Sequence, residues 1–532
     1  MFELEGEKMK MRRFVRAAVL AASAALAVSA GSAVLAQEAS NAGITLTYGL
    51  GSTWDNLNPY NVSTLYSIAV ANKIFDQLAY TDANHDVKPR AAESWEMEDD
   101  GYSIVLHLRE DAKWHDGEPV TAQDWVFTFN LMADPEVTGS TTSYLAAIEG
   151  IDGSGNKEEG AEIGVEARDD YTLVIHLDNP TYPEEFLTSY ARFYYSVLPE
   201  HLLSDVAPAD LMTDEFWSHP VGSGPFMFES EVAGEVLTLK AFNDFYLGAP
   251  GAETLIYKKV DTANMLTAMA AGELDATYPG ITADEAAAID GLYDNIKVET
   301  SQDTTFYGIF NNNERLNTDL RRAIDRAIDK QLLVDQLALG EGYVADTCVS
   351  KASVYKNTDV KFERDLDAAK KFLEDSGYDT SKPLKMAVVA GIRERIAAVI
   401  QQNLKEIGLD IEITTTDSAS MFAGLKDGTY DLIIFTTPYS YLPTFFKNYV
   451  DPNAAYGTRA TTTAYFDAFL DMQSEQDEEK RIEKCKELQA FLADEVPFLG
   501  LYEENVIMIR SARSEGITSV GTDEGWLWTA ND

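Results

Sequence analysis

The stretch that decides the fold runs from Lys88 to Asp134 and reads KPRAAESWEMEDDGYSIVLHLREDAKWHDGEPVTAQDWVFTFNLMAD. Residues 102–109 alternate apolar and more polar side chains, which predicts a strand with one apolar face. Asp116-Gly117 then supplies a turn. Thr121 can cap a helix whose first turn holds Asp124. Trp125, Val126 and Phe129 share one face of that helix. The stretch therefore predicts a strand, a turn and a helix.

The order of these pieces resembles the signature segment of solute-binding family 5, the extracytoplasmic solute-binding proteins of oligopeptide and dipeptide ABC importers. The segments that carry the resemblance are Ala92-Glu93-Ser94-Trp95, Asp100-Gly101, Leu106-His107-Leu108-Arg109, and Trp114-His115-Asp116-Gly117 followed by Pro119-Val120-Thr121-Ala122. Further landmarks follow in the family's order, among them Pro220 to Phe226, Gly272 to Asp275 and Val496 to Tyr502. Each motif is weak alone, but their order through most of the chain is specific.

The N-terminus predicts a secreted protein. A basic segment ending at Arg16 precedes an Ala-rich apolar run, and Val34-Leu35-Ala36 supplies the small residues of a cleavage site. We expect residues 1–36 to be a signal peptide, with no lipoprotein cysteine and a periplasmic or secreted location. The alternative is an N-terminal membrane anchor, but Gly31-Ser32 interrupts the run and a span needs about 20 apolar residues.

The chain is strongly acidic. It holds 42 Lys and Arg against 88 Asp and Glu, a formal net charge of −46. Such a surface repels phosphate backbones and anionic lipid, which disfavours nucleic-acid and membrane-surface functions. It could attract a cationic ligand, but a highly solvated surface is the simpler interpretation. The charge therefore does not identify the ligand.

Cys348 and Cys485 are the two cysteines of the sequence. Cys485 shares an apolar helical face with Ile482, Leu488 and Leu492, which favours a buried small hydrophobe. An oxidising compartment would permit a disulfide between the two cysteines. The sequence leaves that bond open, because the geometry it requires cannot be read from spacing.

The clearest structural unit lies between about 365 and 440. Amphipathic helical patterns over 366–373 and 396–407 end at glycines, and a shorter helix is expected through Phe422 and Leu425. Strand patterns cover 384–389, 411–413 and 430–436. This β-α-β-α-β order predicts parallel strands joined by right-handed crossovers. No low-complexity linker separates it from the rest, which favours interwoven domains.

No catalytic or cofactor motif is present in the sequence. It contains no G-x-S-x-G, H-E-x-x-H, C-x-x-C or Walker A pattern, and its six histidines have no metal-ligand spacing. Gly222-Ser223-Gly224 is followed by Pro225 and a strand, which indicates a plain turn and not a phosphate loop. We therefore expect a protein that is not an enzyme and holds no metal and no cofactor.

The family resemblance implies an α/β, bilobal, periplasmic-binding-protein type II-like fold of three interwoven domains with an interlobe cleft. Domain I is expected to be discontinuous and to take 41–73, 195–300 and 500–532. Domain II is expected at 74–194 and domain III at 301–499.

Site residues also follow from the resemblance. It implies that the loop Thr64-Leu65-Tyr66 lines one wall of the cleft and that the loop after the 430–436 strand faces the ligand. Three tyrosines fall at cleft positions of the family. The resulting ligand-binding set is Thr64, Leu65, Tyr66, Tyr278, Tyr307, Pro438, Tyr439, Ser440, Tyr441 and Tyr502. Ordinary half-buried packing is the alternative for any single tyrosine.

One position departs from the peptide-binding pattern. Members that bind a peptide's terminal ammonium usually have an aspartate shortly after this strand, whereas Ser440 stands near that position here. A buried ammonium without a counter-charge is costly. Either another acid supplies the charge or the ligand lacks the ammonium, and a tyrosine-rich wall could equally stack on sugar rings.

Together these features predict the substrate-binding protein of an ABC importer, with a peptide-like ligand and with permease and ATPase on separate chains. We expect a monomer that binds no nucleic acid. An oligosaccharide ligand is the first alternative, a secreted hydrolase acting on peptide or glycan is the second, and a ligand sensor for a receptor is the third. Turnover of a candidate ligand would identify the hydrolase.

Overall fold

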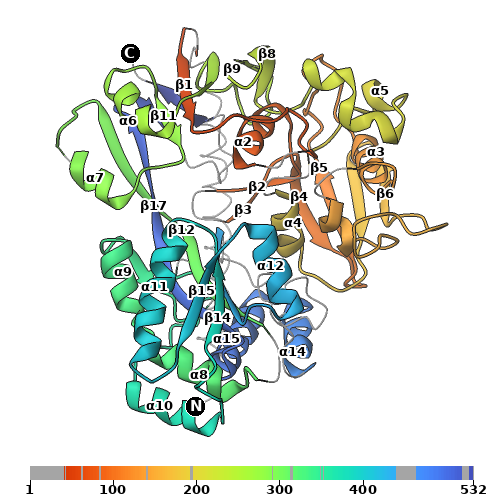
Figure 1. Ribbon diagram of the computed structural model, residues 1–532. Helices are drawn as coiled ribbons and strands as arrows, with labels where there is room; N and C mark the ends of the chain where they lie inside the picture. The colour runs from red at the N-terminus through yellow and green to blue at the C-terminus, as the bar shows by residue number, and fades with distance from the viewer. Residues whose placement is uncertain are drawn as a thin grey trace, which may run out of the picture.

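The fold is described from a computed structural model of the chain (Figure 1). It describes residues 41, 43–61, 64–82, 86–138, 142–191, 196–289, 291–311, 315–347, 349–351, 353–438, 463–517 and 527–530. The predicted signal peptide, Cys348, Tyr439, Ser440 and Tyr441 lie outside these residues.

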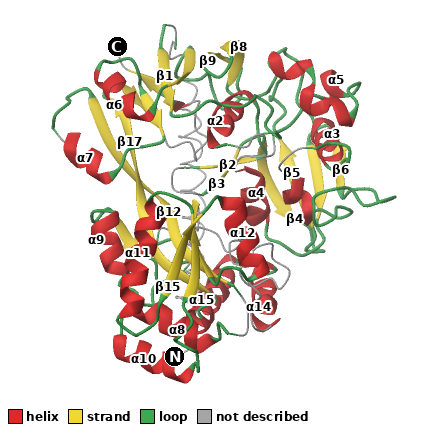
Figure 2. Ribbon diagram, viewed as in Figure 1, coloured by secondary structure: helices red, strands yellow, loops and turns green. Residues whose placement is uncertain are grey.

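Helices and strands occur in both the upper and the lower part of the molecule (Figure 2). The strands are β1 (Thr45–Leu50), β2 (Ala79–Thr81), β3 (Val87–Pro89), β4 (Ala92–Met97), β5 (Ser103–Leu108), β6 (Val165–Asp169), β7 (Thr172–His176), β8 (Phe226–Val232), β9 (Val236–Ala241), β10 (Thr254–Lys259), β11 (Ala276–Tyr278), β12 (Ile296–Phe310), β13 (Gly342–Val344), β14 (Leu384–Val388), β15 (Ile411–Thr415), β16 (Leu432–Pro438), β17 (Phe498–Ser511), β18 (Ser514–Glu515) and β19 (Thr529–Ala530). The α-helices are α2 (Leu65–Ile74), α3 (Ala122–Met132), α4 (Pro183–Ala191), α5 (Glu200–Leu203), α6 (Thr262–Ala270), α7 (Ala283–Ile289), α8 (Thr318–Ala327), α9 (Lys330–Leu337), α10 (Leu366–Asp375), α11 (Ile392–Lys405), α12 (Ser418–Asp427), α14 (Thr463–Gln473) and α15 (Glu478–Glu495).

An 11-stranded sheet runs through the molecule in the order β15-β14-β16-β12-β17-β11-β1-β10-β9-β8, with β13 paired to β17. Its two longest strands, β12 and β17, pair antiparallel from Ile296–Ser511 to Ile309–Phe498. The end of this ladder near Ser511 lies in the upper part of the molecule as drawn in Figure 1, and the end near Phe498 lies in the lower part. We call β13–β16 with helices α8–α15 the lower lobe. The upper lobe comprises β1 and β8–β11 together with the separate four-stranded sheet β4-β5-β7-β6.

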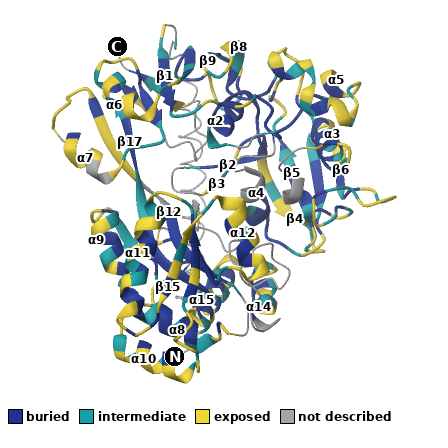
Figure 3. Cartoon of the chain, viewed as in Figure 1, coloured by how far each residue is buried: buried dark blue, intermediate teal, exposed yellow. Residues whose placement is uncertain are grey.

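The lower lobe contains the predicted β-α-β-α-β unit. β14 pairs in parallel with both β15 and β16, as the sequence pattern requires. Two hydrophobic cores cover the two faces of this sheet, one under α8–α11 and one under α12, α14 and α15. Alternate residues of β16 enter different cores, Ile434 the first and Ile433 the second. Figure 3 shows the inner strands of this sheet buried between helices, whereas the edge strand β15 is mostly exposed.

The signature segment forms β4, β5 and α3 in the upper lobe. The carboxylate of Asp124 accepts a hydrogen bond from the Thr121 backbone N–H at 2.8 Å, closing the predicted capping box at the start of α3. Trp125 and Phe129 are buried on the inner face of that helix. The segment therefore builds two neighbouring strands of the four-stranded sheet and a helix that packs against its other two strands, β6 and β7.

The architecture is the predicted α/β bilobal fold. The strands of the four-stranded sheet all lie between Ala92 and His176, within the range expected for domain II. The bounds given for the three domains stay a prediction. Cys485 is a free, buried cysteine. Within the described ranges, no helix has the length and apolar character needed to cross a bilayer.

Candidate ligand-binding site

The lower lobe presents the carboxyl ends of three parallel strands at one edge of its sheet. Open α/β sheets bind ligands at this kind of edge. Here α11 begins directly after β14, at the N-cap Gly391. In its first turn the guanidinium of Arg393 donates a hydrogen bond to Thr436 Oγ1 of β16 at 2.6 Å. Arg393 Nε is buried and has no hydrogen-bond partner among the described residues, and burial lowers the pKa of this guanidinium.

A row of paired residues continues this edge across two further strands. Pro438 at the end of β16 pairs with Thr304 of β12, and Thr304 pairs with Glu504 of β17. Because strand neighbours lie about 4.8 Å apart, Glu504 stands roughly 10 Å from Pro438. Burial raises the pKa of the half-buried Glu504 to about 7, although the charge of Arg395 acts to lower it.

The upper lobe contributes an aromatic pair. Thr64 caps α2 by accepting a hydrogen bond from the Ser67 N–H at 3.2 Å, and Leu65 and Tyr66 follow it half-buried. The rings of Tyr66 and Tyr278 meet edge to face with centroids 5.3 Å apart. Tyr278 ends β11 and Tyr66 lies in the first turn of α2, so these two predicted site residues contact each other.

Strand β17 connects the two groups. Ile281, three residues after Tyr278, forms a bridge with Ile507, and its N–H donates to the Ile507 carbonyl at 2.8 Å. Ile507 and Glu504 are three residues apart on the same strand, about 10 Å at the usual rise per residue. The Tyr66–Tyr278 pair and the row of paired residues from Pro438 to Glu504 thus lie beside neighbouring parts of β17.

The structure separates the other predicted tyrosines. Tyr307 is 2% exposed in the core under α12, α14 and α15, whereas Tyr502 is 0% exposed in the core under α8–α11. Tyr502 stacks on Phe306 with ring centroids 4.6 Å apart. Their rings are packing residues here, and ligand contact by any predicted residue stays a prediction. The backbone of Pro438 lies in the edge row, and the loop after it is outside the described residues.

Two residues at this edge were not anticipated from the sequence. Arg393 stands two residues after Gly391, at the carboxyl end of β14. The rule that ligands bind at the carboxyl ends of parallel strands could have identified it. Glu504 sits in the run Glu503-Glu504-Asn505, which looks like any acidic surface segment. Only its pairing with β12 brings it to the edge.

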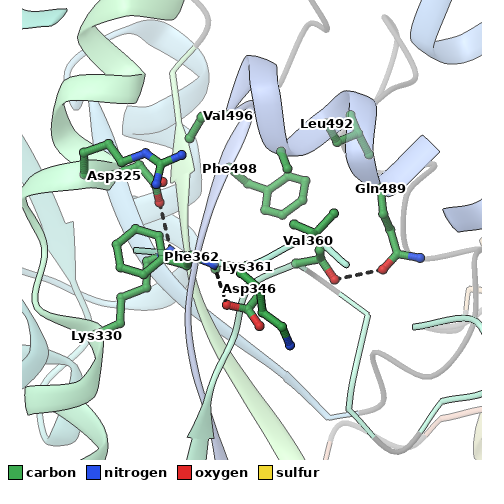
Figure 4. Close-up of a pocket in the computed structure, with 14 residues that line it drawn as sticks. Asp325, Lys330, Asp346, Val360, Lys361, Phe362, Gln489, Leu492, Val496 and Phe498 are labelled. Atoms are coloured by element: carbon green, nitrogen blue, oxygen red, sulfur yellow. Dashed lines mark hydrogen bonds and ion pairs between the residues drawn. The ribbon is translucent and has the colours of Figure 1, made fainter. Parts of the chain in front are cut away.

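A small cavity lies elsewhere, inside the lower lobe (Figure 4). It encloses about 50 Å³ between α8, α9, α15 and β17. Lys330 forms an ion pair with Asp325 at 2.9 Å beside it, with its ammonium 3.6 Å from the centroid of the Phe362 ring. Burial lowers the pKa of Lys330. None of the predicted site residues that the structure describes lines this cavity.

Comparison with known proteins decides the family. The model for bacterial extracellular solute-binding proteins, family 5, matches residues 86–457. The chain belongs to this family. Within the described part of the chain, no group of three or more His, Cys, Asp or Glu side chains is arranged to hold a metal ion.

Named relatives agree with the family match. The oligopeptide-binding protein AppA of Bacillus subtilis is 26% identical over 478 residues, covering 85% of this chain and 84% of AppA. The periplasmic oligopeptide-binding protein OppA of Haemophilus influenzae is 27% identical over 412 residues, covering 72% and 73%. The structure of B. subtilis AppA with a nonapeptide superposes with a TM-score of 0.71 at 23% identity, covering 92% and 99% of the two chains. That structural likeness shows the shared fold.

Proposed function

We propose that this family 5 chain is the extracytoplasmic substrate-binding protein of an ABC importer and that its ligand is a peptide. The relatives named above are oligopeptide-binding proteins. The observation that carries the proposal is the arrangement of the two lobes around β12 and β17. In this arrangement the Tyr66–Tyr278 pair lies beside one part of β17, and the row that ends at Glu504 lies beside the next part. A site built from two lobes suits an extended ligand that both must contact.

Delivery to a membrane importer follows from this function. The permease and the ATPase would be separate chains, because the sequence has no nucleotide-binding motif. Export by the N-terminal segment would place the mature chain, from Gln37, in the periplasm or outside the cell. We expect it to act as a monomer.

Mass spectrometry of small molecules released from the purified secreted protein tests the ligand class. The proposal predicts a mixture of short peptides. Recovery of sugars alone would overturn it and favour the oligosaccharide alternative. Incubating the recovered molecules with the protein separates capture from hydrolysis, because a binding protein returns them uncleaved.

A further inference from the structure

The two lobes meet a second time to the right of β12 and β17 in Figure 1, where α4 faces α14 and α15. Helix α4 belongs to the upper lobe, because Phe186 and Leu187 are buried in the core of that lobe. Its first turn is also tied to β4, where Trp95 Nε1 donates a hydrogen bond to Glu184 Oε1 at 3.2 Å. Helix α15 belongs to the lower lobe, whose core contains Cys485. Contacts between α4 and these two helices therefore cross from one lobe to the other.

The side chains that make this second contact are aromatic, polar or charged, and most of them are buried. The guanidinium of Arg481 on α15 lies 3.6 Å from the ring centroid of Tyr182, the residue before α4. Gln473 of α14 donates a hydrogen bond to Glu185 of α4 at 3.4 Å. Tyr182 and Glu185 are each 1% exposed, and Arg481 is 5% exposed. The lower lobe thus supplies part of the cover over two side chains of the upper lobe.

Arg481 is held in position by its own lobe. Its Nε donates a hydrogen bond to the Tyr355 hydroxyl at 3.2 Å, and its Nη1 donates to the Glu475 carbonyl at 2.9 Å. Because the donors of a guanidinium point outward in its plane, these bonds leave its face available to an aromatic ring. If the lobes moved apart, Arg481 would keep both hydrogen bonds and would lose only the ring of Tyr182.

A contact of this composition can open at little net cost. A buried charge has lost its hydration, and that loss offsets much of the attraction it gains from its partners. Separation of the lobes would return water to Arg481 and Glu185, whereas separation of an apolar interface would expose hydrocarbon. Polar interfaces between domains accordingly permit relative motion. The second contact therefore has the character of a latch and not of a permanent joint.

We propose that Arg481, Tyr182, Glu185 and Gln473 form a clasp that holds the lobes in the arrangement in which α4 meets α14 and α15. We call this arrangement closed. The clasp releases when the lobes separate about β12 and β17, the strands that run from one lobe to the other. It therefore sets how often the empty protein is closed and how long a bound ligand stays enclosed.

The clasp is separate from the proposed ligand site. None of its residues belongs to the Tyr66–Tyr278 pair or to the row of paired residues that ends at Glu504, so it acts on the ligand only through the arrangement of the lobes. This inference rests on the proposed function, because a ligand that contacts both lobes binds their closed arrangement. The apparent affinity for such a ligand falls in proportion to the fraction of empty molecules that are closed.

Small-angle X-ray scattering of the protein, after removal of bound molecules by dialysis, tests the clasp. Tyr182→Leu removes the ring, and we expect it to have a larger radius of gyration than the wild type. Tyr182→Phe keeps the ring over Arg481 and should retain the wild-type value. Tyr246→Leu makes the same change inside the upper lobe, where the ring lies 5.0 Å from the guanidinium carbon of Arg109, and should leave the radius unchanged.

Release of a bound peptide provides a second readout. The probe is a labelled short peptide of a sequence recovered from the purified protein, displaced by an excess of the same peptide without label. We expect release to be several-fold faster from Tyr182→Leu than from the wild type, and unchanged in Tyr182→Phe. Gln473→Ala removes the lower-lobe partner of Glu185 and should shift both readouts in the same direction by a smaller amount. Circular dichroism checks the folding of each variant, and Gln473→Ala decides the test if Tyr182→Leu does not fold.

The outcomes separate the clasp from the proposed function. A wild-type radius of gyration in both Tyr182→Leu and Gln473→Ala would overturn the clasp, as would release that is not accelerated. An equal increase of the radius in Tyr246→Leu would also overturn it, because the effect would then be general loosening. Failure of the wild type to bind any short peptide would instead overturn the proposed function, and the scattering data would still decide whether the clasp exists.

Discussion

At the scale of single residues, His115 explains why two distant family motifs occur together. It belongs to Trp114-His115-Asp116-Gly117, and its ring contacts the glycine-rich turn that follows Pro220. Its Nδ1 accepts a hydrogen bond from the Gly222 N–H at 3.2 Å, and its Nε2 donates to the Gly224 carbonyl at 3.0 Å. This pattern uses the neutral imidazole, with one donor and one acceptor. Burial accordingly lowers the pKa of His115 to about 4.

This geometry predicts a loss of stability in mild acid. The unfolded chain protonates His115 near pH 6.5, whereas the folded chain does so only near pH 4. The contribution is therefore complete above pH 6.5 and is lost as the pH falls toward 4. Urea unfolding of wild type and His115→Asn should show the stability difference shrinking by about 2 kcal/mol between pH 7 and pH 4.5. A difference that does not depend on pH would contradict this role.

Residue-level prediction from the sequence had a clear limit. The capping residue Asp124 and the buried Cys485 could be predicted, because local spacing determines a cap and an apolar helical face. The burial of Tyr307 and Tyr502 could not, since their surroundings come from helices far along the chain. Glu504 was indistinguishable from the many other acids of the sequence until its strand partners were known.

At the scale of elements, β17 passes close to the segment that follows β11, and this contact fixes the position of the upper lobe against the strand. The Gly280 backbone passes so close to this strand that an added Cβ would lie 2.1 Å from the Ile507 carbonyl oxygen. That contact keeps the Ile281–Ile507 bridge beside the Tyr66–Tyr278 pair. Position 280 therefore requires glycine, because there is no room for a side chain.

Gly280→Ala should accordingly destabilise the protein by about 1–3 kcal/mol, the usual range when a crowded site is overfilled. It should also weaken peptide binding, because the upper wall must move away from β17. Gly153→Ala is the matched control, since its added Cβ would meet nothing within 4 Å. Thermal unfolding and peptide retention of both variants provide the measurement. Equal behaviour of the two would show that the close approach is unimportant.

The elements themselves were predictable to different degrees. The unit between 365 and 440 was confirmed because its helices are amphipathic and its strands short, so that local periodicity suffices. The length of β12 and β17 was not foreseen. They pair residues separated by about 200 positions, and nothing in local sequence specifies such a partner.

At the scale of the whole molecule, a second contact joins the lobes away from β12 and β17. The guanidinium of Arg481 on α15 lies over the ring of Tyr182, 3.6 Å from its centroid, just before α4. Gln473 of α14 also donates a hydrogen bond to Glu185 of α4 at 3.4 Å. Both Arg481 and Tyr182 are buried, which strengthens a cation–π contact.

A double-mutant cycle measures this contact. Tyr182→Leu and Arg481→Met should each destabilise the protein, and together they should cost less than the sum of the two. The expected coupling free energy of unfolding is about 1 kcal/mol, the scale of a desolvated cation–π pair. Strictly additive effects would mean that the ring and the guanidinium contribute separately.

The central claim is that one peptide contacts both lobes beside β17. Hydrogen–deuterium exchange, with and without a saturating short peptide of a sequence recovered from the purified protein, tests it most directly. We predict slower exchange on binding in three segments at once, 64–66, 276–281 and 502–505, with 165–176 of the four-stranded sheet unchanged. Protection confined to a single lobe, or absent from 502–505, would contradict the account.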